Sequence, residues 1–300
     1  KEIALSKPVT GESSAPTSYN VAAVVQPSVA TDSQHEGDKE AGKEATAEPT
    51  ETGSREATGT SGFRNSGEVA SRVVSNWNGF VSALNDNSIQ NITISGNVVA
   101  TGDNGNTDNG RANSVDRTVA INSQGRNVVI QGRNDQASLD LLSNSLKFTG
   151  SSAWNLVFKN LQLATGNSKG AVDLSSTTGA NTVTFENVKS QGSSLYGGGG
   201  NTDVIVKGET SSTVSDSYRS ANGQTQYVQR NVGSAGHSVL RREANIHDAK
   251  SVTVADGASL TLNRSSQGDG INLAGGSTVR VNDGASLTIN MNTNNGTESA

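Results

Sequence analysis

Cysteine is absent from this 300-residue chain, and large apolar side chains are scarce: aromatic residues make up 4% and hydrophobic residues 32%. Without cysteine, the protein has neither disulfides nor thiolate metal sites. The hydrophobic content is too low for the core of a conventional globular protein of this length. A stacked repeat fold needs less apolar surface, because each layer buries only a thin strip of Val, Ile and Leu.

Long apolar runs and a strong charge imbalance are missing as well. No run approaches the ~18 residues that cross a bilayer, so membrane insertion is not expected. The formal net charge is −5; residues 1–65 hold ten acidic and six basic side chains, and the remainder holds 18 and 17. This nearly neutral remainder argues against binding to nucleic acid, which needs a basic surface. The chain starts at Lys1 without a signal-peptide pattern, and we interpret it as an excised or processed fragment.

Residues 1–66 differ in composition from the rest of the chain. They are rich in Thr, Ser, Ala, Glu and Gly and poor in large apolar residues. Such a segment buries too little apolar surface to offset the entropy lost on folding. We therefore predict a disordered Thr/Ser/Glu-rich linker over 1–66 and a folded domain over 67–300. Within the linker, "VAAVV" at 21–25 has the composition of a short strand.

A near-repeat of eight residues gives the first indication of the fold. "DGASLTLN" at 256–263 recurs as "DGASLTIN" at 283–290, and each copy follows a strand-like triplet. The Asp-Gly pair favours a turn, because glycine adopts positive φ at little cost. Similar triplets lie at 92–94, 128–130, 156–158, 183–185, 204–206, 252–254 and 279–281. This pattern predicts an all-β parallel β-solenoid, in which equivalent strands of successive coils stack.

Aligning the triplets predicts two ladders of outward side chains, one of alternating charge and one of amides. They comprise Lys159, Glu186 and Lys207, and Asn91, Asn127 and Asn155. We interpret both ladders as structural, since exposed ion pairs contribute little stability. In the longest interval between triplets, "TQYVQ" at 225–229 is interpreted as the strand of an intervening coil.

Apolar residues at the middle of three triplets predict a covering segment. Val129, Val157 and Ile205 should face outward, where they would form an exposed apolar stripe. Segment 208–249 departs furthest from the regular period, and it is the segment expected to lie over them.

A short helix is predicted at the start of the solenoid. In "SNWNGFVSALNDN" at 75–87, Trp77, Phe80, Val81 and Leu84 lie on one helical face, and Ser75 or Asn76 is placed to cap it. Solenoids need caps at their ends because the last coil otherwise exposes its core. We expect a capping helix at about 76–85.

Three stretches carry a family resemblance: "SNWNGFVSALNDNSIQNITISGNVVATG", "DRTVAINSQGRNVVIQG" and "NLVFKNLQLATG". They resemble the pectate-lyase-like adhesive domain of Gram-positive surface proteins, and are most similar to the binding regions of the serine-rich repeat adhesins of lactobacilli. The resemblance covers about 72–300 in pattern and 75–190 most specifically. It implies a right-handed parallel β-solenoid displayed on the cell wall, which binds host or matrix glycans, including acidic polysaccharides, and is not generally catalytic.

Enzymatic activity is not expected, although true pectate lyases share this fold. A glycosidase needs two carboxyl groups roughly 5 to 10 Å apart, and a lyase needs carboxylates that hold calcium beside a base. No Asp-x-Asp, Asp-x-Glu or Glu-x-Asp occurs in 66–300. The loop at 102–114 lacks the closing Glu of a calcium loop, and no cofactor or metal is predicted. A lyase or hydrolase acting on uronic-acid polymers is the alternative.

Glycan binding is predicted in segment 208–249 and beside it. The segment combines net positive charge with tyrosines; guanidinium groups bind carboxylates and aromatic rings stack on sugars. Tyr196, alone among Gly and Ser, either projects toward a sugar or packs back over a coil. The predicted glycan-binding residues are Tyr196, Tyr218, Arg219, Tyr227, Arg230, Arg241, Arg242 and Lys250, and the candidate pH-sensitive residues are His237 and His247.

These observations favour a non-catalytic adhesin module that binds glycans. The resemblance implies a cell-surface location in a Gram-positive bacterium, wall-anchored or secreted, with host epithelial or mucus glycans or acidic polysaccharides as partners. A structural or self-associating surface module remains a further alternative.

Overall fold

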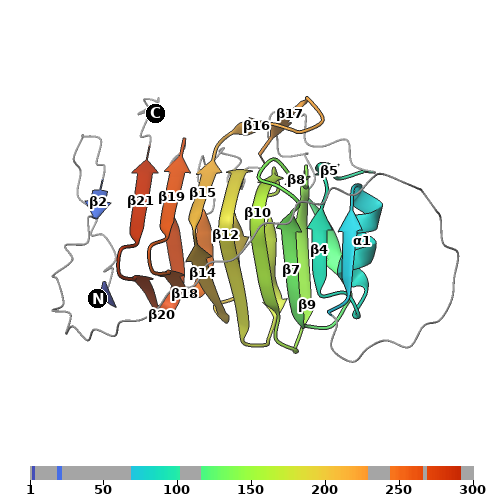
Figure 1. The fold of residues 1–300 in the computed structure, drawn as a ribbon. Helices are drawn as coiled ribbons and strands as arrows, with labels where there is room; N and C mark the ends of the chain where they lie inside the picture. The colour runs from blue at the N-terminus through green and yellow to red at the C-terminus, as the bar shows by residue number, and fades with distance from the viewer. Residues whose placement is uncertain are drawn as a thin grey trace, which may run out of the picture. The chain divides into compact units, whose positions relative to one another are not determined.

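The structure is a computed structural model, and it describes residues 2–3, 19–21, 69–101, 116–228, 244–265 and 269–291. The chain divides into two compact units, Lys1–Val24 with Val69–Ala300, and Val25–Glu68. All described residues belong to the first unit. This unit contains a 19-stranded, mainly parallel sheet that winds through successive coils (Figure 1).

Each coil contributes strands to three faces. The first face contains β3 (Ser71–Val74), β4 (Asn91–Ile94), β7 (Asn127–Gly132), β14 (Thr202–Lys207) and halves of β10 (Asn155–Thr165), β12 (Asn181–Gly192), β18 (Ile246–Val254) and β20 (Ile271–Val281). The second face contains β5 (Asn97–Val99), β8 (Ser138–Asp140), β15 (Glu209–Val214), β19 (Ser259–Arg264), β21 (Ser286–Met291) and the later halves of β10 and β12. The third face contains β6 (Arg117–Ile121), β9 (Asn144–Gly150), β11 (Val172–Thr177), β13 (Tyr196–Gly197) and the earlier halves of β18 and β20. The predicted all-β parallel β-solenoid is confirmed.

The repeated octets occupy equivalent corners of consecutive coils, as predicted. β19 pairs in parallel with β21 so that Leu260 lies opposite Leu287. Gly257 and Gly284, which precede these strands, have φ values of 67° and 66°. This is the left-handed region that glycine enters without steric cost.

A second kind of corner joins the first face to the second. Asn160 and Asn187 adopt positive φ (49° and 52°), and the Asn187 Nδ2 donates to Asn160 Oδ1 at 3.0 Å. Asn187 Oδ1 in turn accepts from the backbone N–H of Glu209 at 3.0 Å. The amide side chains therefore stabilise a left-handed corner that bends one long strand across two faces.

The predicted outward ladders are confirmed in part. Lys159 pairs with Glu186 at 2.7 Å, and Glu186 lies opposite Lys207. Asn155 Nδ2 donates to Asn127 Oδ1 at 2.8 Å. Asn91, however, lies opposite Val129 and not Asn127, so its place in the amide ladder was predicted wrongly. A register shift of two residues keeps the same side chains inward, and the apolar pattern alone does not detect it.

The capping helix is α1 (Trp77–Asn85), and Asn76 is its N-cap, with its side chain accepting from the Gly79 N–H at 2.9 Å. Trp77, Phe80 and Leu84 are buried against the first coils. Its C-terminal end is held from a distance by one side chain, Arg126, which donates to the carbonyl groups of Leu84, Asp86 and Ile89 at 2.9, 3.0 and 3.1 Å. Burial lowers the pKa of this guanidinium, which also lies 5.5 Å from the ring centroid of Trp154.

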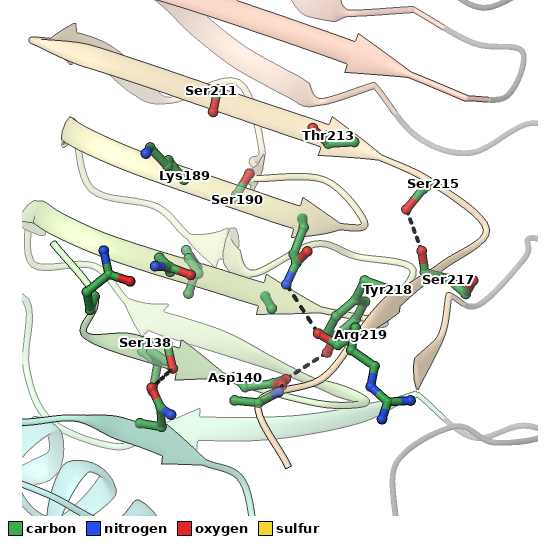
Figure 2. A pocket seen from close by; sticks show the side chains of 18 residues that line it. Ser138, Asp140, Lys189, Ser190, Ser211, Thr213, Ser215, Ser217, Tyr218 and Arg219 are labelled. Carbon is green, nitrogen blue, oxygen red and sulfur yellow. Dashed lines mark hydrogen bonds between the residues drawn. The ribbon is translucent and has the colours of Figure 1, made fainter. Parts of the chain in front are cut away.

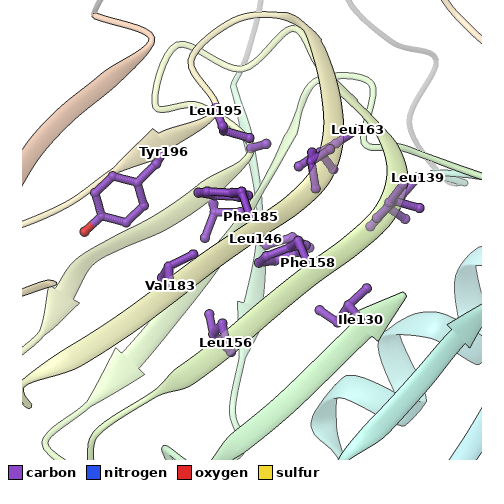
Figure 3. Close-up of a cluster of buried hydrophobic side chains, with 14 of the residues drawn as sticks. Ile130, Leu139, Leu146, Leu156, Phe158, Leu163, Val183, Phe185, Leu195 and Tyr196 are labelled. Atoms are coloured by element: carbon purple, nitrogen blue, oxygen red, sulfur yellow. The ribbon is translucent and has the colours of Figure 1, made fainter. Parts of the chain in front are cut away.

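The core consists of inward-facing apolar side chains, which stack in rows across successive coils (Figure 3). Phe158 stacks on Phe185 with ring centroids 5.6 Å apart. Tyr196 belongs to this core: it lies between Val172 and Ile246 in the inward row of the third face and is fully buried. Burial raises the pKa of its hydroxyl. Of the two interpretations of Tyr196, projection toward a sugar is wrong, because Tyr196 takes the inward position of the two-residue strand β13.

Segment 208–249 is more regular at its start than predicted. Residues 209–214 form β15, an ordinary rung between β12 and β19. The departure begins after β15 with an antiparallel hairpin, β16 (Ser217–Arg219) and β17 (Thr225–Tyr227). The interpretation of 225–229 as an intervening coil was therefore wrong. The hairpin lies over the second face rather than over Val129, Val157 and Ile205, which are half-buried on the first face (Figure 1).

Two short strands of the N-terminal segment pair with the last coil. β1 (Glu2–Ile3) is antiparallel to β20, and β2 (Tyr19–Val21) is antiparallel to β21. β2 ends at Val21, the first residue of the strand-like run at 21–25, so the predicted disordered linker does not include these two short strands. The proposed linker over the rest of 1–66 lies outside the described residues and stays a prediction.

Candidate functional site

A groove formed by described residues runs along the second face and has a volume of about 720 Å³. We call it the second-face groove. It is lined by Asn97, Gln136, Ser138, Leu139, Asp140, Gln162, Leu163, Ala164, Lys189, Ser190, Gln191, Ser211, Thr213, Ser215, Ser217, Tyr218, Arg219 and Ala221 (Figure 2).

The floor of the groove is a ladder of polar side chains from five successive strands. Its members are the outward residues Asn97, Ser138, Gln162, Lys189 and Ser211, each opposite the next across the sheet. They point outward because side chains alternate along a strand and the neighbouring residues are inward and buried. Ser138 Oγ donates to Asn97 Oδ1 at 2.9 Å. The result is a row of hydroxyl and amide groups with one ammonium group, repeating every ~4.8 Å.

The β16–β17 hairpin forms the wall of the groove, and Asp140 holds it there. Asp140 is 2% exposed. Its Oδ1 accepts from the Tyr218 hydroxyl at 2.7 Å, and its Oδ2 accepts from the Ser220 hydroxyl and from the Ala221 N–H at 3.0 Å. A fourth donor, the backbone N–H of Leu142, bonds Oδ1 at 3.0 Å. A buried carboxylate is thus satisfied by a segment about 80 residues further along the chain.

Two glycines let the hairpin approach the sheet. A Cβ on Gly192 would lie 2.8 Å from the Tyr218 ring, and one on Gly166 would lie 2.7 Å from the Tyr227 carbonyl oxygen. Tyr218 packs with Ala164 and Val228 in a small apolar cluster and is 6% exposed. Its ring therefore anchors the hairpin, and the prediction that Tyr218 offers a face to a sugar is wrong.

Arg219 is the predicted residue that fits the groove best. It is exposed, lines the groove at the hairpin wall, and its carbonyl accepts from Gln191 Nε2 at 3.5 Å (Figure 2). Tyr227 is half-buried on β17. The structure brings Arg219 and Lys189 to one groove, whereas Lys250 lies on the first face.

The other predicted residues lie elsewhere or outside the described part of the chain. His247 is on the third face in the row of Asp173 and Gly197, is 8% exposed, and its Nδ1 is 3.5 Å from Asp248 Oδ2. A Cβ on Gly197 would lie 2.7 Å from the His247 ring, so the imidazole covers that glycine. Arg230, His237, Arg241 and Arg242 lie outside the described residues.

The floor of the groove was missed from the sequence. The triplets that were aligned belong to the first face, and the ladder belongs to the strands that follow them. Aligning these second strands, from 161, 188, 210, 260 and 287, would have shown polar residues at the outward positions, such as Gln162, Lys189 and Ser211. A ladder that mixes hydroxyl and amide groups with a single lysine carries a weaker sequence signal than a cluster of arginines.

Most residues that line the groove are neutral and polar. Among the described lining residues Asp140 is the one acid, and donors occupy both of its oxygens. Across the described ranges, no group of three or more His, Cys, Asp or Glu side chains is arranged to hold a metal ion. No helix among these residues has the length and apolarity to cross a membrane.

Comparison with known proteins gives a family-model match over part of the chain and two solved structures with a similar fold. Residues 71–196 match the model of the putative pectate lyase-like adhesive domain. No curated protein sequence is similar enough to the chain to count as a relative. Two solved structures are similar: the SRRP of L. reuteri 53608 (23% identity, TM-score 0.55, 72% of this chain and 68% of that chain) and the SRRP of L. reuteri 100-23 (17% identity, TM-score 0.53, 74% and 61%). This chain therefore spans less than two thirds of the second structure's length. The resemblance predicted from the sequence is confirmed as a match to the adhesive-domain family over residues 71–196, on a solenoid fold shared with the SRRP structures.

Proposed function

We propose that this chain is an adhesin module that binds an extended glycan in the second-face groove without catalysing a reaction on it. The adhesive-domain match supports a role in adhesion. We assign glycan binding to the second-face groove because its lining is mostly polar. The observation that carries the proposal is the ladder of outward polar side chains from Asn97 to Ser211 on five successive strands.

The spacing of the ladder suits a polymer with a short repeat. The four spacings between Asn97 and Ser211 amount to about 19 Å at ~4.8 Å per strand, and a pyranose repeat is about as long as one spacing. Hydroxyl and amide groups exchange hydrogen bonds with sugar hydroxyls, so each coil can contact one sugar unit. A glycan that crosses the strands would make the same kind of contact several times.

Two cationic groups favour a glycan that carries carboxylates. Lys189 stands in the floor and Arg219 at the wall, and both are exposed. A guanidinium group binds a carboxylate through two parallel hydrogen bonds, which an ammonium group does not provide. We include Arg230, Arg241 and Arg242 in this proposal on the strength of the sequence, as the residues that follow the hairpin.

The absence of catalysis is part of the proposal. The carboxylate of Asp140 is occupied by four donors and holds the hairpin, so it has no oxygen left to accept a proton from a substrate. The test is incubation with polygalacturonate while unsaturated products and reducing ends are monitored. Formation of either product at an enzymatic rate would favour the lyase or hydrolase alternative.

Binding is tested by titrating the protein with galacturonate oligosaccharides of increasing length. Affinity should rise with length until the oligosaccharide spans the ladder, and then level off. Lys189→Ala and Arg219→Ala should each weaken binding about tenfold, the effect of losing about 1.5 kcal/mol in a charge-assisted hydrogen bond. Added salt should weaken binding further in the wild type, because these charges are exposed.

The matched control is Lys207→Ala, which removes an exposed lysine from the first face. It should leave oligosaccharide affinity in the groove unchanged. Unchanged affinity in both Lys189→Ala and Arg219→Ala would contradict the groove as the site. Light scattering that increases with protein concentration would instead favour the self-associating alternative.

The cellular context follows from the same proposal. An adhesin module acts outside the cell, and we place it on the surface of a Gram-positive bacterium, wall-anchored or secreted. Its partners would be host epithelial or mucus glycans, or other acidic polysaccharides. Flow cytometry of the bacterium with an antibody against the solenoid tests this location.

A further inference from the structure

The outward side chains of the two repeated octets lie beyond the second-face groove. The octets form β19 and β21, whose leucine and isoleucine side chains pack in or against the core. The alternate residues of both strands, in the order Ser, Thr and Asn, therefore point outward. We call these six residues the C-terminal plane: Ser259, Thr261 and Asn263 on β19, and Ser286, Thr288 and Asn290 on β21.

The C-terminal plane continues the floor of the groove. Ser211, the last member of the polar ladder, lies opposite Thr261, and Thr261 lies opposite Thr288 (Figure 1). In the next row, Thr213 lines the groove and accepts from Asn263 Nδ2 at 3.4 Å through its hydroxyl. The plane adds two strand spacings to the four of the groove, which lengthens the row from about 19 Å to about 29 Å at ~4.8 Å per strand.

The hydroxyl groups of the plane are available to a ligand. All six residues are exposed or half-buried. The two amides form one edge, where Asn290 Nδ2 donates to Asn263 Oδ1 at 2.9 Å. Within the described ranges, no protein group bonds the hydroxyls of the other four members, Ser259, Thr261, Ser286 and Thr288. Each hydroxyl can therefore donate one hydrogen bond and accept two, as a sugar hydroxyl does.

Charge distinguishes the plane from the groove. The groove contains two exposed cations, whereas the six residues of the plane are uncharged. Glu209 lies opposite Ser259, and Asp256 and Asp283 belong to the Asp-Gly turns that precede the two strands. These three acids are exposed, against one lysine at the same corner, Lys207, at the end of β14 on the first face. The Debye length is about 8 Å at physiological ionic strength, so the acids disfavour a carboxylate on the plane.

We propose that the C-terminal plane extends the second-face groove with subsites for uncharged sugar units, so that the module selects a glycan in which an uncharged block adjoins an acidic block. The inference rests on the function proposed above, because the plane receives the part of the glycan that leaves the groove. The cations of the groove attract the acidic block, and the acids beside the plane exclude it from the last two spacings. Selection thus combines an attractive and a repulsive element.

The repetition of the octet fits this role. Because the two strands present the same residue types in register, consecutive spacings offer the same hydroxyl and amide groups. Two identical sugar units can then make equivalent contacts. The groove differs in this respect, since its floor changes residue type at nearly every strand.

The experiment measures affinity by calorimetry with the intact chain. The ligands are tetragalacturonate, hexagalacturonate, and tetragalacturonate extended by two galactose units at one end or at the other. Galactose and galacturonate differ only at C6, so the hexasaccharides differ only in the carboxylates that would lie over the plane. One of the two galactose-extended ligands should bind about fivefold more tightly than tetragalacturonate, the effect of about 1 kcal/mol from one neutral hydrogen bond. Hexagalacturonate should gain nothing.

Variants locate this gain. Thr261→Val and Thr288→Val remove a hydroxyl and keep the β-branched shape that suits a strand. In the double variant the galactose extension should add no affinity, and tetragalacturonate should bind as it does to the wild type. The matched control is Thr253→Val, which removes an outward threonine from the first face and should retain the gain. Lys189→Ala should weaken the binding of tetragalacturonate and of the extended ligand by the same factor.

The outcomes separate this inference from the function proposed above. It would be overturned by galactose-extended ligands that bind no more tightly than tetragalacturonate, or by a gain that survives in the double threonine variant. A hexagalacturonate that gains as much as the galactose-extended ligand would also overturn it, because the acids would then exclude nothing. Tetragalacturonate binding that is indifferent to both Lys189→Ala and Arg219→Ala would instead contradict the groove itself, and this inference would fall with it.

Discussion

Replacing Asp140 by alanine should release the β16–β17 hairpin while the solenoid stays folded. The hairpin places three donors on this carboxylate: the Tyr218 hydroxyl, the Ser220 hydroxyl and the Ala221 N–H. A hydrogen bond to a charged group contributes about 1.5–3 kcal/mol, so three at the lower value give about 4–5 kcal/mol. The inward residues of β8 and β10 do not depend on these bonds. The loss should therefore be local.

Hydrogen exchange measures this effect directly. The N–H groups of Ser220 and Val228 are bonded within the hairpin segment, to Gln224 O and Asp216 O, and should be protected in the wild type. In Asp140→Ala their exchange should accelerate about a thousandfold, the factor that corresponds to about 4 kcal/mol. The melting temperature of the solenoid should change by only a few degrees.

The matched control is Tyr218→Phe, which keeps the ring in its cluster with Ala164 and Val228 and removes one donor. Its exchange rates should fall between those of the wild type and Asp140→Ala. Oligosaccharide affinity should follow the same order, because Arg219 loses its fixed position at the groove wall when the hairpin opens. Hairpin amides that exchange at the wild-type rate in Asp140→Ala would refute the reasoning, and so would melting of the whole solenoid together with the hairpin.

Two further predictions concern the N-terminal cap. Arg126→Lys should destabilise the protein by about 3 kcal/mol and lower its melting temperature by about 6–12 °C in calorimetry, because one ammonium group cannot replace a fork that binds several carbonyls. The pKa of Asp86 lies below its ordinary value of 3.8, chiefly because Ser88 donates to the carboxylate from its hydroxyl and its backbone N–H. The ionised carboxylate therefore stabilises the folded protein above pH 3.8, and this contribution is lost as the pH falls through the lowered pKa. Asp86→Asn should flatten the fall in melting temperature on the acid side of pH 3.8; an unchanged pH profile would show that other carboxylates dominate it.

The fold was largely readable from the sequence because the solenoid repeats one physical requirement. Each coil must bury a strip of apolar side chains and then turn a corner, so strand triplets and Asp-Gly pairs recur together. The helix α1 was predictable for a related reason. Trp77, Phe80 and Leu84 need an apolar surface to cover, and the end of a stacked core provides it.

The sequence did not determine which residues of different coils lie side by side. A two-residue shift at β4 keeps Ile92 and Ile94 inward, so the apolar pattern is the same in either register. Tyr196 was misplaced for a similar reason, since glycine and serine on both sides concealed a strand whose inward position it fills. The path of the hairpin depends on a contact between Asp140 and Tyr218, separated by 78 residues, which no local pattern reveals.

In this fold the inward residues determine the architecture and the outward residues determine the function. The sequence therefore predicts the architecture more readily than the function. The core constrains every second residue, and Phe158 and Phe185 are interchangeable with other large apolar residues as far as the pattern is concerned. The alternate, outward positions are free to vary. A binding surface arises when neighbouring coils carry polar side chains at the same outward position of their strands. Gln162, Lys189 and Ser211 share no residue type, yet they form one floor because their strands are in register. The informative unit for function is therefore the row across coils, and a site in such a protein is found by aligning each face separately.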